Sequence, residues 1–282
     1  MTLQQALGLA LQASIVMTVF SFGLRTAPDD VLYVGRRPWL LTRSLVAMFV
    51  IMPLVAVAFA MFFELRPSVE IALVALAISP IPPLLPGREQ KAGGHASYAL
   101  GLMMIAAVLS IGIVPAEVNL LGRYSMKPFA MSPGAIAGMA LKAAVLPLVV
   151  GMLLRALLPA VAARIARPVE IIATVVLVGS VLVLLAGTFT AVLALVGNGA
   201  IVAMAAFVLT GLAVGHVLGG PRAGDRLVLA LSTASRHPAI ALAIAKANFP
   251  DEPHLGATIV LYLLVSLLIG IPYQVWQMRR NR

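Results

Sequence analysis

The segment Leu231-Ser232-Thr233-Ala234-Ser235-Arg236-His237-Pro238 places a guanidinium and a proline inside a long apolar stretch. The residues on both sides, 227–231 and 239–245, are hydrophobic enough to lie in lipid. An arginine at mid-bilayer costs roughly 2.5–3.5 kcal/mol on the mildest insertion scale, so an ionisable residue there indicates a functional site. Pro238 removes one helical hydrogen bond and clashes with the preceding turn. Because a broken helix at membrane depth is stable only when buried in protein or lining a cavity, we expect this segment to form part of a binding site.

The composition predicts a polytopic membrane protein. Of 282 residues, 61% are hydrophobic and 11% are charged, whereas soluble domains average about 45–50% apolar and about 25% charged residues. The chain has no cysteine, which excludes disulfides, thiolate metal sites and cysteine nucleophiles. The net charge of +10 would favour nucleic acid as a partner of a soluble protein. Here the basic residues fall mostly in short loops, so the predicted partner is the lipid bilayer and no nucleic acid is expected.

The fold class predicted from these features is all-α, with nine transmembrane helices. A bilayer core needs about 20 apolar residues per helix, and nine segments approach that length. The first lacks a basic stretch before it and is therefore expected to be retained rather than cleaved. The nine segments are Leu3–Leu24, Trp39–Phe63, Ser68–Leu85, His95–Leu121, Pro133–Leu157, Val169–Leu195, Gly199–Leu218, Leu227–Ala247 and Leu255–Val275.

The distribution of Lys and Arg predicts the orientation in the cell (inner) membrane, because cytoplasmic loops are enriched in basic residues. The loops on the other side hold only Arg66, Arg123 and Lys127. This asymmetry predicts an outside N-terminus and a cytoplasmic C-terminus. The loops predicted to be cytoplasmic hold Arg25, Arg36, Arg37, Arg43, Arg88, Lys91, Arg155, Arg164, Arg167, Arg222, Arg226, Arg279, Arg280 and Arg282.

The third and eighth segments are interrupted at corresponding positions. Counting along the chain, segments one to four match six to nine, and the odd offset of five gives the two halves opposite orientations. Paired interruptions in an inverted repeat indicate the binding site of a secondary transporter. For a single kinked segment, the frequency of proline in membrane helices would be sufficient explanation. The predicted helix breaks, with four prolines within residues 80–86, are Ser79, Pro80, Pro82, Pro83, Pro86 and Pro238.

Polar side chains at the breaks are the candidates for substrate or ion binding. In the second break these are Ser232, Thr233, Ser235, Arg236 and His237. The alternative for the arginine and histidine is a purely structural link that ties the broken helix to its neighbour.

One acidic residue, Glu89 near the first break, completes the candidate set. Its alternative is an ordinary interfacial residue paired with Arg88 or Lys91.

The chain resembles the bile acid:sodium symporter family over nearly its whole length. Residues 49–53 (Phe-Val-Ile-Met-Pro) resemble the family's turn before its first crossing helix, and Ser79-Pro80 lies at the family's first break. Residues 239–249 are similar to the run after the second break. The resemblance implies two crossing broken helices within a panel domain and a core domain, in a nine-helix member. The panel would comprise about 3–24, 133–157 and 169–195, and the core about 39–63, 68–94, 95–121, 199–218, 227–247 and 255–275.

The family's sodium ligands are not retained in this chain. A sodium ion about 4 Å from Arg236 would be repelled by roughly 4 kcal/mol at an effective dielectric near 20, and the second break has no carboxylate to offset this. Sodium, which the resemblance implies, is therefore disfavoured, and no other cofactor or metal is predicted. By alignment, the family's Glu, Gln and Asn of the second break fall on Ser232, Arg236 and His237. Its Ser-Asn pair of the first break falls on Leu85 and Pro86, and a further Gln falls on Met48.

The function expected from these features is secondary transport of a small organic anion by alternating access. In one hypothesis Arg236 is a fixed positive charge that binds the anion through its planar fork of donors. In the other, His237 titrates near neutrality and couples transport to protons. Uncoupled transport, a channel and a non-transporting sensor are the alternatives. A membrane enzyme is not expected, because the four histidines are scattered and His237 is only two residues from Ser235, a spacing that does not bring side chains together on a helix.

Overall fold

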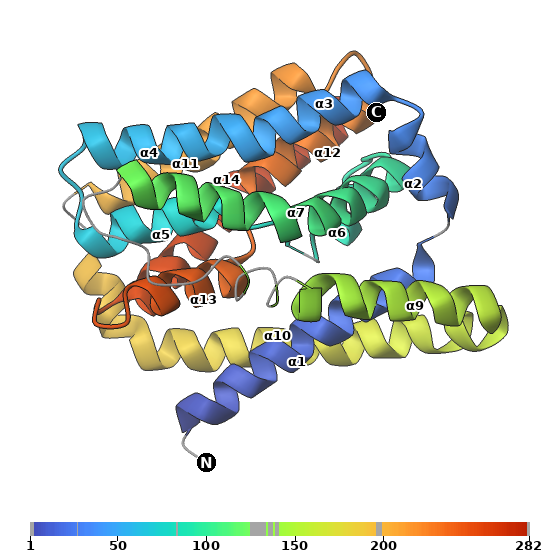
Figure 1. Cartoon of the computed structure of the whole chain (residues 1–282), viewed down its shortest axis with the longest axis horizontal. Helices are drawn as coiled ribbons and strands as arrows, with labels where there is room; N and C mark the ends of the chain where they lie inside the picture. Colours follow the sequence, from blue (N-terminus) through green and yellow to red (C-terminus); the bar gives the residue numbers. More distant parts are fainter. Residues whose placement is uncertain are drawn as a thin grey trace.

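The computed structural model describes residues 3–26, 28–82, 84–124, 141–195 and 199–280, with the isolated positions 134 and 138. Within these ranges the regular structure is entirely helical (Figure 1). The first half contains α1 (Leu3–Arg25), α2 (Pro28–Gly35), α3 (Pro38–Val46), η1 (Ala47–Ile51), α4 (Met52–Phe62), α5 (Pro67–Ile78), α6 (Leu85–Lys91) and α7 (Ala96–Tyr124). The second half contains η2 (Leu141–Val145), α9 (Leu146–Leu157), α10 (Pro159–Leu195), α11 (Ala200–Leu218), α12 (Ala223–Ala234), α13 (Pro238–Asn248) and α14 (Leu255–Arg280).

Seven stretches of the described chain are long and apolar enough to cross a membrane. They coincide with seven of the nine predicted segments, which confirms a polytopic all-α protein. The third and fifth predicted segments correspond to the shorter apolar helices Pro67–Ile78 and Leu146–Leu157. The start of the fifth segment lies outside the described residues, so the number nine stays a prediction.

The helices form two layers (Figure 1). In one layer α1, α9 and α10 pack against one another, and the remaining helices make up the other. The layers meet where α10 contacts α14 and where η2 contacts α1 and α7. Gly23 of α1 lies directly on Gly151 of α9, since a Cβ added to Gly23 would come within 2.9 Å of the Gly151 Cα. The described parts of the three predicted panel segments thus lie side by side; a panel that moves as one unit stays a prediction.

Two helices differ from the sequence-based expectation. The sixth predicted segment starts at Val169, but α10 begins ten residues earlier, at Pro159, and continues through Pro168. Residues 160–166 include four alanines, which favour helix strongly enough to extend it through a proline kink. Residues 28–30, expected in a connection, begin the short helix α2, with proline in its first turn and Asp29 and Asp30 near its positive end.

Both π-helical turns lie immediately before a proline. η1 ends just before Met52-Pro53, and η2 just before Leu146-Pro147. A proline has no amide hydrogen, and its ring clashes with the carbonyl four residues earlier. Widening the turn to i→i−5 hydrogen bonding relieves that clash, and such π-bulges are frequent at functional sites. The bond from the Met52 amide to the Ala47 carbonyl shows this pattern in η1.

Tyr33 anchors α2 to the start of the second broken helix. Its hydroxyl donates to the carboxylate of Asp225, with oxygen–oxygen distances of 3.1 and 3.3 Å. The ring lies between the guanidinium of Arg37, 3.6 Å from its centroid, and the stacked ring of His95, 4.1 Å away. This cluster holds α2, α7 and α12 together at one end of the molecule.

Candidate functional site

The two predicted breaks meet in the interior. The first separates α5, which ends at Ile78, from α6, which begins at Leu85; the second separates α12 from α13 at residues 235–237. α5 packs against α13, and α6 packs against α12. Where the two breaks cross, the His237 amide donates one hydrogen bond to the Pro80 carbonyl and one to the Ser79 hydroxyl, both 3.0 Å long. The breaks therefore support each other, because each satisfies main-chain groups that the other exposes.

Ser79 is more than a helix breaker. Its hydroxyl donates to the Leu76 carbonyl at 2.7 Å while accepting from the His237 amide. Its own carbonyl accepts from Nη1 of Arg236 at 3.3 Å. In a continuous helix this carbonyl would bond the amide of residue 83, but that residue is proline and has no N–H.

The guanidinium of Arg236 lies at the centre of the site. The side chain is only 1% exposed. Nη1 reaches the Ser79 carbonyl, and Nη2 donates to the Met48 carbonyl at 3.0 Å. Nε has no hydrogen-bond partner within the described residues. One arginine therefore links the second break to both the first break and η1.

The Met48 carbonyl is available because of Pro53. In an α-helix it would accept from the amide of Met52, but that amide bonds the Ala47 carbonyl in the π turn. In a π-helix it would accept from residue 53, which is proline and has no N–H. The Met48 carbonyl thus has no main-chain donor within its helix, and the Arg236 guanidinium donates to it instead.

His237 caps a helix. It is 4% exposed, and its Nδ1 accepts from the Ile240 amide at 3.3 Å as the N-cap of α13, directly before Pro238 at the first helical position. Accepting at Nδ1 requires this nitrogen to be unprotonated, so protonation of His237 would compete with the cap. The geometry thus gives His237 a structural role in the break.

Glu89 and Ser232 join the two broken helices. The Ser232 hydroxyl donates to Oε1 of Glu89 at 2.8 Å, and the glutamate is fully buried. Burial of the side chain and its bond to α12 place Glu89 in the interior, and the alternative, an ordinary interfacial residue paired with Arg88 or Lys91, stays a prediction. Oε2 has no partner among the described residues.

The remaining predicted residues lie around these contacts. Thr233 is fully buried, and its hydroxyl has no hydrogen-bond partner in the described part of the chain. Ser235 is half-buried and ends α12, with its amide on the Leu231 carbonyl at 2.9 Å. The Pro82 carbonyl accepts from the Leu85 amide at 3.0 Å, and Pro86 is in the first turn of α6. Pro83 lies outside the described residues.

Two site residues were missed from the sequence. Tyr262 of α14 is 1% exposed, and its hydroxyl donates to the Ala234 carbonyl at 2.8 Å, which satisfies the end of α12. The second is Glu117 of α7, whose two carboxyl oxygens are buried and have no hydrogen-bond partner among the described residues. The only sequence signal was a single acid within the fourth predicted segment, four residues from its end.

A family model matches the larger part of the chain. Residues 13–195 match the family model described as the Sodium Bile acid symporter family. This protein belongs to that family. The matched range contains the first break, while the second break lies beyond it. In Bacillus subtilis (strain 168), a protein described as an uncharacterized sodium-dependent transporter, YocS, is 23% identical over 137 residues. The alignment covers 49% of this chain and 42% of YocS, so the chain spans less than half the length of this relative.

The carbonyl oxygens of Met48 and Ser79 in this family member already have a hydrogen-bond donor. The described residues contain no group of three or more His, Cys, Asp or Glu side chains that could hold a metal ion. Sodium is a hard cation that takes several oxygen ligands, and the carbonyls of Met48 and Ser79 are already bonded to Arg236. A sodium ion at these carbonyls would have to displace a buried guanidinium.

A small cavity lies between the two layers, next to both breaks. It holds about 20 Å³ of free space, roughly the room for one water molecule. The surrounding side chains are apolar except for His237. Residues from α1, α7 and α9 complete the lining, which consists of Val19, Pro80, Ile81, Met103, Ala107, Leu148 and His237.

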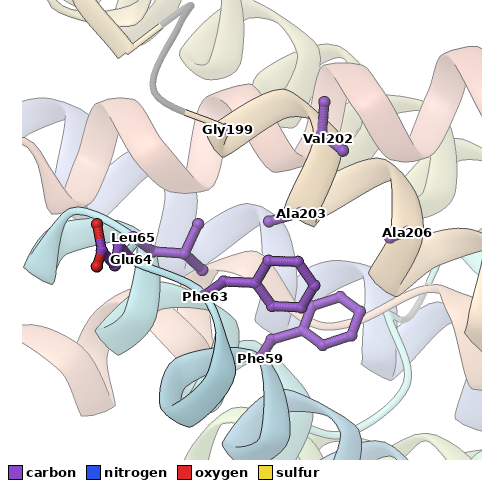
Figure 2. Close-up of a pocket in the computed structure, with 8 residues that line it drawn as sticks. All are labelled: Phe59, Phe63, Glu64, Leu65, Gly199, Val202, Ala203 and Ala206. Atoms are coloured by element: carbon purple, nitrogen blue, oxygen red, sulfur yellow. The ribbon is translucent and has the colours of Figure 1, made fainter.

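A larger hollow of about 160 Å³ is separate from the breaks (Figure 2). It lies between the end of α4 and the start of α11, where Phe59 and Phe63 pack edge to face with ring centroids 5.3 Å apart. Glu64, the one charged lining residue, points away from the rings (Figure 2). The hollow contains no residue of either break, so the candidate site is the smaller cavity.

Proposed function

We propose that this protein is a secondary transporter of a small organic anion that works by alternating access without sodium. The observation that carries the proposal is the coordination of the Met48 and Ser79 carbonyls by the Arg236 guanidinium. Main-chain carbonyls at a helix break are oxygen ligands of the kind that hold sodium in transporters. Here the guanidinium, a covalently attached cation, takes the place of a sodium ion at these carbonyls.

Arg236 gives the site a positive charge in every conformation of the transport cycle. An arginine guanidinium stays charged in proteins, so it supplies a permanent cation rather than one recruited from solution. A permanent positive charge at the breaks favours the approach of an anionic substrate and disfavours a metal cation there. Since Nη1 and Nη2 are bonded to carbonyls, the charge acts on a substrate mainly through its field in this conformation.

The carboxylate of Glu89, which follows the first break, lies beside the second break. By the family alignment the sodium-binding glutamate falls on Ser232, and Ser232 bonds Glu89 of α6. This arrangement supports a site in which the two half-helices stay coupled while the ion ligands have changed. Proton-coupled and uncoupled transport are both compatible with it.

Alternating access is supported by the layering. The layer of α1, α9 and α10 contacts the other helices along a limited border, and the small cavity opens at that border beside Pro80 and His237. We propose that this layer is the panel and that the helices around the breaks are the core. The predicted orientation, with the N-terminus outside the inner membrane, places α6 and α12 in the cytoplasmic half.

Uptake into proteoliposomes tests the proposal. Cholate, pyruvate and acetate would be offered with equal concentrations of sodium or potassium outside. We expect at least one anion to accumulate at the same rate in both salts. Strong sodium dependence of that uptake would overturn the role of Arg236 as the built-in cation, and no uptake of any anion would favour a non-transporting role.

A further inference from the structure

The chain has two tryptophans, and each lies beside an arginine four residues further along its helix. The guanidinium carbon of Arg43 lies 4.9 Å from the ring centroid of Trp39, at the start of α3. That of Arg280 lies 5.5 Å from the ring centroid of Trp276, at the end of α14. The two tryptophans are 67% and 47% exposed, although both side chains are large and apolar. Two helices far apart in sequence thus repeat one arrangement.

Both Trp–Arg pairs lie at the same end of the molecule, where Figure 1 shows the C-terminus beside the start of α3. Tyr33, shortly before α3, donates to Asp225 at the start of α12. His216, near the end of α11, has its ring centroid 5.9 Å from that of Trp276. Because only residues 219–222 separate α11 from α12, these contacts bring the two pairs to one side. The distribution of basic residues predicts that this side is cytoplasmic.

An exposed apolar face leads away from each pair along the same membrane span. Such faces contact acyl chains in a bilayer, and tryptophan and arginine side chains at their ends lie at the depth of the lipid headgroups. Each pair therefore lies where the phosphate of a phospholipid meets its acyl chains. The faces are formed by Val46, Val50 and Leu54 in the span of α3 and α4, and by Leu268, Ile271 and Val275 in α14.

The two guanidinium groups have no acceptor within the described part of the protein. Neither the Arg43 nor the Arg280 side chain forms a hydrogen bond or an ion pair with a described residue. In the layer of α1, α9 and α10, by contrast, Arg25 pairs with Glu170, and Arg155 donates to the Arg25 carbonyl. The N–H donors of Arg43 and Arg280 thus fit an anion from outside the described chain.

We propose that each Trp–Arg pair binds the phosphate of an anionic phospholipid whose acyl chains lie on the apolar face of the same span. The planar fork of an arginine matches phosphate oxygens, and contact with the indole ring holds the guanidinium in place. The exposed Arg36, Arg222 and Arg279 add positive charge at this end, which favours a headgroup with net negative charge over a zwitterionic one. This inference concerns the lipid partner and goes beyond the transported substrate.

The tryptophans themselves can report binding, because bromine atoms on a lipid acyl chain quench indole fluorescence at contact. Trp276→Phe leaves Trp39 as the single tryptophan, and Trp39→Phe leaves Trp276. Each variant would be reconstituted in phosphatidylcholine bilayers with increasing fractions of brominated phosphatidylglycerol or, in parallel, of brominated phosphatidylcholine. Arg43→Gln and Arg280→Gln are introduced into both backgrounds, so that each arginine variant is the matched control for the other pair.

We expect half-maximal quenching at a several-fold lower fraction of the anionic lipid than of the zwitterionic lipid at each tryptophan. A basic residue near an anionic membrane surface contributes about 1 kcal/mol, so Arg43→Gln should raise the anionic fraction needed at Trp39 about fivefold and leave Trp276 unchanged. Arg280→Gln should do the reverse. Equal quenching by the two lipids, or an anionic preference at Trp39 that survives in Arg43→Gln, would overturn the proposal.

A soluble phosphate compound is the other source of the same chemistry. Glycerol phosphate carries the headgroup anion without acyl chains, and an excess of it should leave the quenching in place. Full relief of quenching would assign the pairs to a soluble phosphate and overturn the lipid assignment.

A version with both tryptophans covers the case in which a Trp→Phe variant does not fold. The double variant Arg43→Gln/Arg280→Gln should then lose the anionic preference of the summed signal. Arg164→Gln, which removes an exposed arginine of α10, should keep it. An unchanged preference in the double variant, or an equal loss in Arg164→Gln, would show that the Trp–Arg pairs are not the lipid sites.

Discussion

Nη2 of Arg236 donates to the main-chain carbonyl of Met48, 3.0 Å away, at the π turn before Pro53. This bond exists because neither the α nor the π hydrogen-bonding pattern provides a donor for that carbonyl. A proline in the second predicted segment and an arginine in the eighth predicted segment are thus two parts of one contact. The contact connects two segments far apart in sequence, and Nη1 of the same arginine adds the Ser79 carbonyl of the first break.

Replacing the arginine should destabilise the site and stop transport. Arg236→Gln leaves two buried carbonyls without their donor, and each unsatisfied group costs about 1–3 kcal/mol. We expect a lower midpoint of thermal unfolding in detergent and loss of sodium-independent anion uptake. Arg164→Gln, an exposed arginine on α10, is the control and should change neither. Wild-type uptake by Arg236→Gln would show that the guanidinium is not needed.

Restoring an amide at position 53 should weaken the same contact. Pro53→Ala provides an N–H that can bond the Met48 carbonyl in the π turn or allow the turn to become α-helical. We expect slower uptake and a changed thermal midpoint. Pro147→Ala alters the same π-helix-then-proline pattern at η2, whose carbonyls are not among the described hydrogen-bond partners of Arg236. Equal loss of uptake in both variants would mean that the effect does not pass through the arginine.

The bond between Glu89 and Ser232 should appear as an energetic coupling between the half-helices. Ser232→Ala leaves the fully buried Glu89 without its described hydrogen-bond partner, at a cost of about 1–3 kcal/mol. In a double-mutant cycle with Glu89→Gln, we expect a coupling of about 0.5–3 kcal/mol between the two sites. Thermal or denaturant unfolding of the four proteins measures it. Strict additivity would indicate that the two side chains do not support each other.

Reinstating two of the family's residues should bring back a response to sodium. By the family alignment, Ser232→Glu with Arg236→Gln restores a carboxylate and removes the competing cation. We expect uptake by this double variant to be faster in sodium than in potassium. Ser232→Glu alone keeps the guanidinium, so it should show no sodium stimulation. Identical rates for the double variant in both salts would count against the exchange of sodium for arginine.

At the end of α2, the hydroxyl of Tyr33 should stabilise the protein independently of pH up to about pH 10. Burial raises the pKa of Tyr33 above its ordinary value, and the charge of Asp225 raises it further. A raised folded-state pKa means that the contribution is complete below the unfolded value of about 10 and is lost as the pH rises through the folded value. Tyr33→Phe should lower the thermal midpoint equally at pH 6 and pH 8. A difference between these two pH values would require another titrating group.

Much of the fold followed from local sequence. Runs of apolar residues located the seven long spans, because a bilayer demands length and hydrophobicity from each segment separately. A cluster of prolines located the first break and Pro238 the second, since proline disrupts a helix wherever the helix lies. The early start of α10 and the helix at Pro28 were missed because their signals, helix propensity and capping, are weaker than hydropathy.

The candidate site was only partly predictable. The sequence singled out Arg236, His237, Ser232 and Glu89 as polar groups in apolar surroundings. Their partners depend on which helices cross, and hydropathy carries no information about that. For this reason Glu89 had two competing interpretations, and Glu117 had none.

The sequence by itself determined an all-helical membrane protein with two interrupted segments and an arginine in the second, because each of these properties belongs to one segment. Only the tertiary structure decided what the arginine bonds. The carbonyls of Met48 and Ser79 and the hydroxyl that holds Glu89 come from separate parts of the chain. Their convergence is a consequence of packing, which brings unsatisfied main-chain groups of one break to the donors of the other.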